Sequence, residues 1–290
     1  DWYLGDWLAP MGVDAGNQAS VDLVSNCFIS ECLSTMYKTA ITLGKREEAE
    51  EFAIRREKLN KLIHQTFYRA DEGIYSTGSQ LDMCYPMLVG VVPDSLYNKV
   101  KENVVAMTEE KYKGHIAVGL VGVPILTEWA VRNKQVDFFY QMMKKRDYPG
   151  YLYMIDHGAT ATWEYWSGER SRVHNCYNGI GTWFYQAVGG IRLDEANSGY
   201  RHFYVDPQTP NGVTWAKVTK ESPYGTIAVN WKLKDDNQLN LQLTVPAGTT
   251  ATVCIPNNAV SCKKNKKKVS VKEQTVDVEA GHYDFLFNLK

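Results

Sequence analysis

Residues 157–195 read HGATATWEYWSGERSRVHNCYNGIGTWFYQAVGGIRLDE, and the hydrophobic pattern differs on the two sides of this stretch. Before it, apolar residues recur at helical spacing, as in Ser20 to Leu43, which stops at Gly44, and in Arg46 to Phe67. Further helices are predicted at residues 79–90, 94–111, 116–132, 134–146 and 172–188. Short, regularly spaced helix pairs favour a partial α/α toroid over a compact bundle, with chemistry in the loops that follow the inner helices.

From about residue 200 the hydrophobic period changes to two. Apolar and polar residues alternate from Leu239 to Val245 and from Tyr283 to Phe287, and Pro, Gly, Asn and Asp separate the runs. This pattern predicts an antiparallel β-sandwich. The lysine-rich run Lys263 to Lys268 is interpreted as a charged turn or sheet edge. The fold class is therefore multidomain α and β, with a helical domain over residues 1–198 and a β-sandwich over residues 199–290.

Composition excludes several classes of function. The formal net charge of -1 gives no electrostatic reason to expect a nucleic-acid partner or an anionic membrane surface. No apolar run approaches the ~20 residues that a membrane helix needs. None of the six cysteines lies in a CxxC pair or near a histidine pair, so no zinc site or other metal site is predicted. The chain opens at Asp1 without a signal peptide, and we expect a processed or truncated polypeptide.

Aromatic residues gather around one carboxylate. The chain has 8 Trp and 18 Tyr, and such rings stack on sugar C–H faces. Glu164 lies between Trp163 and Trp166, and His174 follows ten residues after Glu164, which is the layout of a carbohydrate site. The alternatives are an exposed helix-start position for Glu164, a capping or buried imidazole for His174, and core packing for either indole.

This stretch resembles the signature of the bacterial α-L-rhamnosidases of glycoside hydrolase family 78. Those proteins show Gly-Ala-Thr-Thr-x-Trp-Glu-x-Trp, then a His that opens the next helix, then an aromatic helix that ends in Gly-Ile. Three further segments agree with the family: Gly5 to Pro10, His115 to Gly119, and Ser222 to Gly225. The resemblance runs in order from Asp1 to about Pro256.

The resemblance implies an (α/α)6 barrel followed by a C-terminal β-sandwich, and inverting hydrolysis of terminal α-L-rhamnose. It implies that Glu164 is the general base, and that His174 and Trp7 bind the sugar. Asp6 and Trp166 are carried over as further substrate-binding residues. The implied substrate is a rhamnose-containing oligosaccharide or glycoside, no cofactor is implied, and a periplasmic or secreted location is expected.

The chain also departs from the family pattern. Val173 stands where the family usually has Asn, which puts fine substrate preference in doubt, and Ala161 replaces the second threonine of the Thr-Thr pair. The Asp-Glu-Arg-Leu-Gly-Trp type of segment that carries the family's general acid does not occur in these residues. The chain is therefore predicted to carry the base without the acid, and to have little activity alone.

Two other interpretations stay open. Arg170 and Arg172 are compatible with a polysaccharide lyase, or another glycosidase, on the same toroid. Alternatively the chain is a non-catalytic carbohydrate-binding fragment with Trp215 and Trp231 as its platform, although alternation places Trp231 in the core. We favour a packing role for the sandwich. The oligomeric state is not indicated by the sequence.

Overall fold

The computed structural model describes residues 4–10, 16–234 and 237–290. It divides into two compact units, Asp1–Ile180 and Gly181–Lys290. The predicted domain boundary at residue 198 falls inside the second unit. None of the described helices combines the length and the apolar character needed to cross a membrane.

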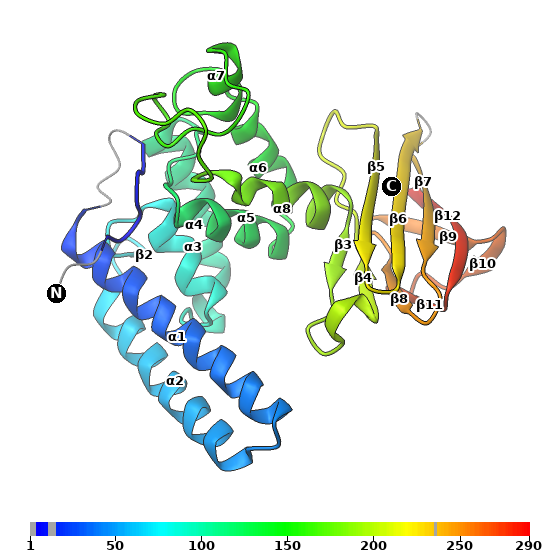
Figure 1. The fold of residues 1–290 in the computed structure, drawn as a ribbon, viewed down its shortest axis with the longest axis horizontal. Helices are drawn as coiled ribbons and strands as arrows, with labels where there is room; N and C mark the ends of the chain where they lie inside the picture. Colours follow the sequence, from blue (N-terminus) through cyan, green and yellow to red (C-terminus); the bar gives the residue numbers. More distant parts are fainter. Residues whose placement is uncertain (1–3, 11–15, 235–236) are drawn as a thin grey trace. The chain divides into compact units, whose positions relative to one another are not determined.

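The first unit is built from paired helices (Figure 1). Asn17 caps the first helix, because its side chain accepts the backbone N–H of Ala19 at 3.0 Å. This helix and the next one lie side by side as an antiparallel pair, as predicted. The helices of the unit are α1 (Gln18–Thr42), α2 (Arg46–Phe67), α3 (Gln80–Leu88), α4 (Asp94–Tyr112), α5 (Gly122–Arg132), α6 (Val136–Met143), α7 (Tyr151–Asp156) and the 3-10 turn η1 (Asn178–Ile180).

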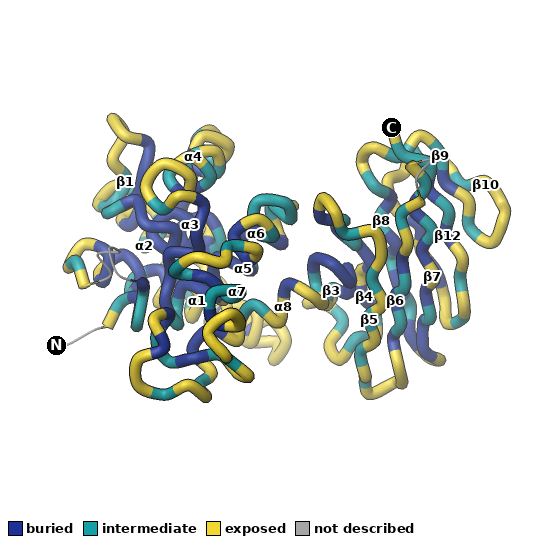
Figure 2. The backbone as a smooth tube through the Cα atoms, turned by 90° about the horizontal axis from the view of Figure 1, so that it is seen from above, coloured by how far each residue is buried: buried dark blue, intermediate teal, exposed yellow. Residues whose placement is uncertain are grey.

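Helix α3 forms the centre of this unit and is buried along its length (Figure 2). It packs against α1, α4 and α5. Its first residue, Gln80, donates to Thr108 Oγ1 at 2.9 Å and to the carbonyl of His115 at 3.0 Å, and accepts the N–H of Ala117 at 2.8 Å. The buried amide of Gln80 therefore holds the segment that precedes α5 in a non-helical conformation.

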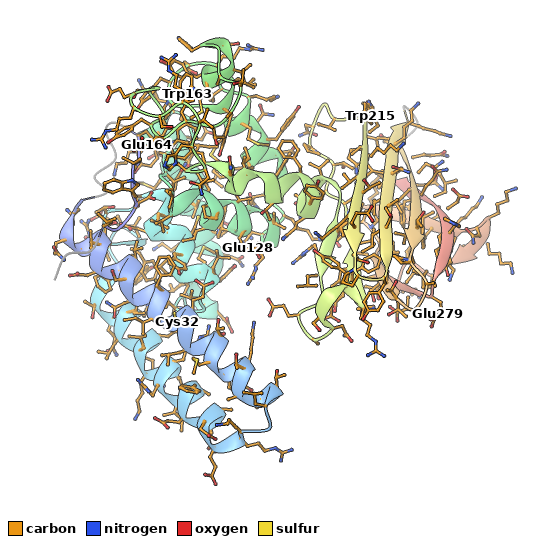
Figure 3. The ribbon with its side chains drawn as sticks, viewed as in Figure 1. Cys32, Glu128, Trp163, Glu164, Trp215 and Glu279 are labelled. Atoms are coloured by element: carbon orange, nitrogen blue, oxygen red, sulfur yellow. The ribbon has the colours of Figure 1, made fainter. Side chains whose placement is uncertain are left out.

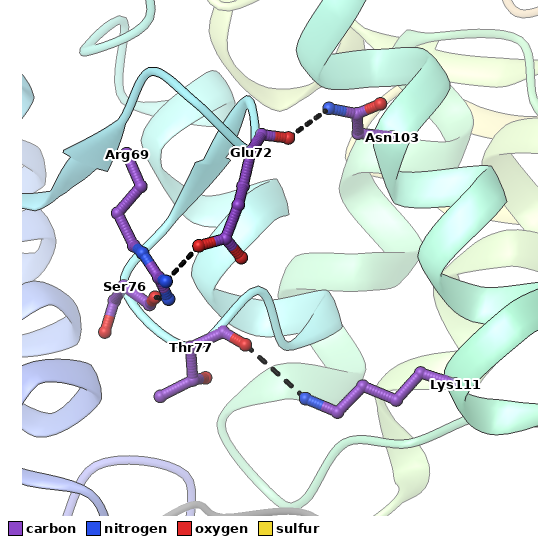
Figure 4. Close-up of polar contacts among 6 residues, drawn as sticks. All are labelled: Arg69, Glu72, Ser76, Thr77, Asn103 and Lys111. Atoms are coloured by element: carbon purple, nitrogen blue, oxygen red, sulfur yellow. Dashed lines mark hydrogen bonds and ion pairs between the residues drawn. The ribbon is translucent and has the colours of Figure 1, made fainter.

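The helical unit also contains a two-stranded hairpin, β1 (Tyr68–Arg69) and β2 (Ile74–Tyr75). Inside the hairpin Arg69 pairs with Glu72. Asn103 of α4 donates to the Glu72 carbonyl at 3.4 Å, and Lys111 of α4 donates to the Thr77 carbonyl at 3.4 Å (Figure 4). These contacts hold the hairpin, and the residues that directly follow it, against α4.

Two predicted helices are shorter than expected, and one helix was missed. The helix predicted at 116–132 begins only at Gly122, and the one predicted at 172–188 begins only with η1. It continues in the second unit as α8 (Gly181–Trp183) and the π-helical turn η2 (Phe184–Val188). Side chains from distant segments bind the backbone of the missing turns, so those residues do not form helical hydrogen bonds. The six-residue α7 was not predicted.

The second unit contains two sheets with strand orders β10-β9-β12-β7-β6-β5 and β11-β8-β4-β3. All neighbouring strands are antiparallel except β4 and β8, which pair in parallel and so depart from the predicted pattern. The strands are β3 (Ile191–Leu193), β4 (His202–Val205), β5 (Trp215–Ser222), β6 (Gly225–Lys234), β7 (Gln238–Val245), β8 (Thr250–Cys254), β9 (Ala259–Lys264), β10 (Lys267–Val269), β11 (Thr275–Val278) and β12 (Gly281–Leu289); a short 3-10 turn η3 (Ser198–Tyr200) precedes β4.

One face of each sheet is buried, as expected where two sheets pack face to face. Trp231 lies in this core and its indole N–H donates to the carbonyl of Val188 at 2.7 Å, which confirms the predicted orientation. Trp215 is exposed (Figure 3). The lysine-rich run forms the β9–β10 hairpin with Asn265 and Lys266 at its turn, again as predicted.

Candidate active site

Asp6 anchors the N-terminal segment to the segment that precedes α5. Its Oδ2 accepts the N–H of Gly119 at 2.7 Å, and its Oδ1 accepts the N–H of Gly122 at 2.9 Å. The Trp7 carbonyl accepts the N–H of Leu120 at 2.7 Å. A Cβ at position 119 would lie 2.1 Å from the Trp7 carbonyl oxygen, so only glycine permits this approach. Asp6 is only 6% exposed.

Burial changes the titration of Asp6. Loss of solvent raises the pKa of Asp6 to about 6, against the opposing effect of its backbone N–H donors. The negative charge of Asp82 raises it further. Asp82 itself is buried in α3 and accepts hydrogen bonds from Ser20 and Thr77. Both carboxyl groups are therefore engaged by the scaffold.

Glu164 lies in the loop after α7, next to Trp163 (Figure 3). Its N–H donates to the carbonyl of Ser171 at 2.9 Å, and its Oε2 accepts the N–H of Ser171 at 3.3 Å. Nη1 of Arg170 lies 3.8 Å from Oε1 of Glu164. The guanidinium group of Arg170 also lies over the ring of Tyr165. The Glu164 side chain keeps 18% of its surface exposed. The carboxylate is thus oriented by the loop and remains open to solvent.

Tyr177 ties this loop to the N-terminal segment. Its hydroxyl lies 2.9 Å from the carbonyl of Leu8 and 3.2 Å from the carbonyl of Glu164, and its single proton is shared between these two acceptors. Burial and the nearby groups of Cys176 and Asp6 raise the pKa of Tyr177 well above its usual range, so the hydroxyl keeps its proton. Sequence reasoning missed Tyr177, because it lies in the predicted helix 172–188, and a tyrosine in an aromatic run carries no local sign of such a bridge.

The ring of Trp166 stacks against the ring of Tyr177. The two rings have centroids 4.1 Å apart and planes inclined by 21°. The indole N–H of Trp166 donates to the carbonyl of Val118 at 2.9 Å, and Tyr151 packs edge-on against its ring. Trp166 is 1% exposed. Substrate contact by Trp166 stays an untested prediction, and this geometry favours a role in holding the loops.

His174 is fixed by backbone contacts within the same loop cluster. The backbone N–H of His174 donates to the carbonyl of Thr162 at 2.8 Å, and its ring Nδ1 accepts the backbone N–H of Cys176 at 3.2 Å. In the neutral imidazole the ring proton is therefore on Nε2. Burial, and then the charge of Glu164, raise the pKa of the Cys176 thiol. Val173, the residue that departs from the family pattern, is 77% exposed beside His174.

The hydroxyl of Tyr177 thus joins the two segments that carry the predicted residues, one with Asp6 and Trp7 and the other with Glu164, Trp166 and His174. Trp7 is partly exposed on the segment that Asp6 anchors, and Tyr177 bonds the next residue, Leu8. Glu164 lies on the other side of that bridge. Among the described residues, no group of three or more His, Cys, Asp or Glu side chains is placed to hold a metal ion.

A unit of paired helices, which carries a carboxylate, a histidine and indoles in neighbouring loops, followed by a unit of two sheets, is the architecture of the helical-hairpin class of proteins with an accessory β domain. Residues 1–188 match the bacterial alpha-L-rhamnosidase 6 hairpin glycosidase domain, and residues 190–270 match the bacterial alpha-L-rhamnosidase C-terminal domain. The chain belongs to the bacterial α-L-rhamnosidase family, as the resemblance predicted.

Known proteins are similar to this chain in sequence and in structure over nearly its whole length. An alpha-L-rhamnosidase of Formosa agariphila is 28% identical over 97% of this chain and 32% of its own length. The structure of the alpha-L-rhamnosidase from Dictyoglumus thermophilum superposes with a TM-score of 0.89 at 20% identity, over 99% of this chain and 34% of that one. The Streptomyces avermitilis alpha-L-rhamnosidase complexed with L-rhamnose gives 0.86 at 24% identity, over 97% and 28%. The chain therefore spans about a third of the length of these relatives.

Replacing Tyr177 by Phe removes the bridging hydroxyl and keeps the ring that stacks on Trp166. Two partly buried carbonyls then lose the donor that they share, so the free energy of unfolding should fall by about 1–2 kcal/mol. Urea unfolding of both proteins measures the change. Tyr37→Phe, at an exposed tyrosine of α1, is the matched control and should change it little. Equal effects of the two substitutions would contradict the bridge.

Asp6 should make stability depend on pH. The pKa of the Asp6 carboxyl group is about 6 in the folded protein and 3.8 for an ordinary aspartate. The folded protein therefore binds this proton more tightly than the unfolded chain does. Stability from this group is present at low pH and is lost as the pH rises from about 4 to about 6, by about 3 kcal/mol. Urea unfolding between these pH values should show the fall in the unaltered chain and not in Asp6→Asn. If the free energy of unfolding changed with pH in the same way in both proteins, Asp6 would not be the group responsible.

Proposed function

We propose that this chain supplies the general base of an inverting α-L-rhamnosidase, which releases terminal α-L-rhamnose from an oligosaccharide or glycoside. Membership of the family and the names of the relatives support the substrate class. The observation that carries the base assignment is the position of Glu164. Its carboxylate is oriented by the N–H of Ser171 and keeps access to solvent, in a loop bonded to the other predicted segments.

Inversion needs a water molecule between the base and the sugar. The two carboxyl groups of an inverting glycosidase stand ~6.5–9.5 Å apart so that a water fits on the face opposite the leaving group. Glu164, as a carboxylate, removes a proton from that water while the water oxygen attacks the anomeric carbon. The glycosidic C–O bond breaks at the same time, and the leaving oxygen takes a proton from the general acid. The Ser171 N–H and the Arg170 guanidinium hold the carboxylate in one orientation during this step.

The general acid is proposed to come from a part of the six-hairpin domain outside residues 1–290. Asp6 does not fit that role, because both of its oxygens face backbone N–H groups of Gly119 and Gly122. On this proposal the chain alone has little hydrolase activity, since an acid or base contributes about a hundredfold to ten-thousandfold to the rate. A periplasmic or secreted location stays a prediction.

His174 and Trp7 are the proposed sugar contacts. The Nε2–H of His174 is a donor for a sugar hydroxyl, because the ring is fixed at Nδ1 by the N–H of Cys176. Rhamnose lacks a 6-hydroxyl, so its methyl group needs an apolar wall, which we assign to the partly exposed Trp7. Asp6 and Trp166 then act behind this wall by holding the two loops in place.

Glu164→Gln keeps the shape of the side chain and removes the base. In a polypeptide that contains the complete six-hairpin domain, kcat for an aryl α-L-rhamnoside should fall by roughly a hundredfold to ten-thousandfold. Release of the phenol measures the rate. Glu169→Gln is the matched control, since Glu169 is an exposed residue of the same loop and should leave kcat near its original value. Near-normal turnover by Glu164→Gln would remove Glu164 from the base role.

Inversion can be tested separately from the identity of the base. Proton NMR of the first minutes of hydrolysis should show β-L-rhamnose before mutarotation produces the α anomer, because water attacks from the face opposite the leaving group. Initial formation of α-L-rhamnose would show retention, and would assign a nucleophile in place of a base.

A further inference from the structure

The outer face of the four-stranded sheet carries a polar cluster that the reaction at Glu164 does not use. Alternation along β4, β8 and β11 buries every second residue and turns the others outward. The strand register places His202 beside Thr250 and Asp277 beside Thr252. The outward row therefore combines a histidine, two hydroxyls and a carboxylate on neighbouring strands.

Hydrogen bonds order this row in one direction. Thr252 Oγ1 donates to Asp277 Oδ1 at 2.6 Å, because a carboxylate only accepts. The Nε2 of His202, 3.1 Å from Thr252 Oγ1, is then the donor of that contact. The Thr250 hydroxyl, 2.7 Å from Nδ1, completes the chain as a donor when the ring is neutral. Three hydrogen bonds with Thr250 and Thr252 thus hold Asp277 and His202 in a fixed arrangement.

This cluster lines a hollow of about 540 Å³. Asp194 and Asn197, from the loop after β3, and Glu279, which follows β11 and is labelled in Figure 3, also line it. Asp194 accepts the N–H of Ala196 at 3.0 Å and the amide of Asn197 at 2.7 Å, and these hydrogen bonds lower its pKa. The hollow therefore offers oriented carboxylate acceptors from two segments, at Asp194 and at Asp277.

The chemistry of the lining selects a ligand rich in hydroxyl groups. The acids do not form a group that could hold a metal ion among the described residues. Vicinal sugar hydroxyls donate to spaced carboxylates and accept from amide and hydroxyl groups, which the hollow supplies together. Tyr204 stands next to His202 with ring centroids 5.5 Å apart, and with 38% of its surface exposed it offers a ring for sugar C–H groups.

We propose that this hollow is a second carbohydrate site, which binds a neutral hexopyranose through the carboxylates of Asp194 and Asp277, with the ring of Tyr204, beside His202 at the edge of the lining residues, as a stacking surface. The site lies wholly within the second unit and does not depend on the reaction at Glu164. Its role is to hold a glycan on the protein independently of the bond that is cleaved.

Residue-resolved NMR of the full chain tests the site. L-rhamnose, D-glucose and D-galactose are titrated separately into the 15N-labelled protein. Saturable shifts at residues 193–204, 250–254 and 275–279 with at least one sugar are expected. Absence of shifts there with all three sugars overturns the proposal. Shifts caused there by calcium chloride and not by any sugar also overturn it, since they assign a cation site.

Substitutions locate the binding within the hollow. Asp277→Asn and Tyr204→Ala should each weaken the sugar-dependent shifts at these residues about tenfold or more, because a hydrogen bond to a charge or a stacking contact is lost. Asp284→Asn, on an exposed carboxylate of the other sheet, is the matched control and should leave the affinity unchanged. Dispersed spectra verify folding of each variant. Unchanged affinity in both Asp277→Asn and Tyr204→Ala overturns the proposal, and Glu164→Gln should leave these shifts intact.

Discussion

The hydroxyl of Tyr177 is the contact on which the arrangement of the candidate active site depends. It bonds the carbonyls of Leu8 and Glu164, two residues that are far apart in the chain. Its ring rests on Trp166, and Trp166 in turn bonds the carbonyl of Val118. One side chain thus fixes the position of the N-terminal segment relative to the loop that carries Glu164, because each partner is a backbone atom that cannot rotate away.

Backbone groups that lack helical partners create the site's loops. Asp6 and Gln80 reach the segment before α5 and bind its N–H groups and a carbonyl. Each of those bonds replaces one that a helix would have made, and buried backbone groups need such a partner. The cost of burying the Asp6 carboxylate is only partly offset by its two donors, since its pKa stays raised. Glycine at 119 is required by the same packing, since no larger residue fits against Trp7.

Local periodicity predicted what local interactions determine. The α1–α2 pair, the alternating strands and the inward face of Trp231 followed from spacing alone. The late start of α5, the non-helical stretch before η1 and the parallel β4–β8 pair did not, because each depends on a partner distant in sequence. At the site, the sequence motif indicated Glu164 and His174. The contact of Tyr177 with the carbonyls of Leu8 and Glu164 could not be predicted, because these two residues come together only in the folded chain.

Two carboxyl groups of this unit show why environment and access must be weighed together. Asp6 has a pKa raised to about 6, a property often found in a general acid. Yet it is almost fully buried and both oxygens bind N–H groups, so no substrate oxygen can reach its proton. Glu164 has fewer constraints and more solvent, which is what a base needs to reach water. Geometry therefore separates a carboxyl group that builds the site from one that is able to act in it.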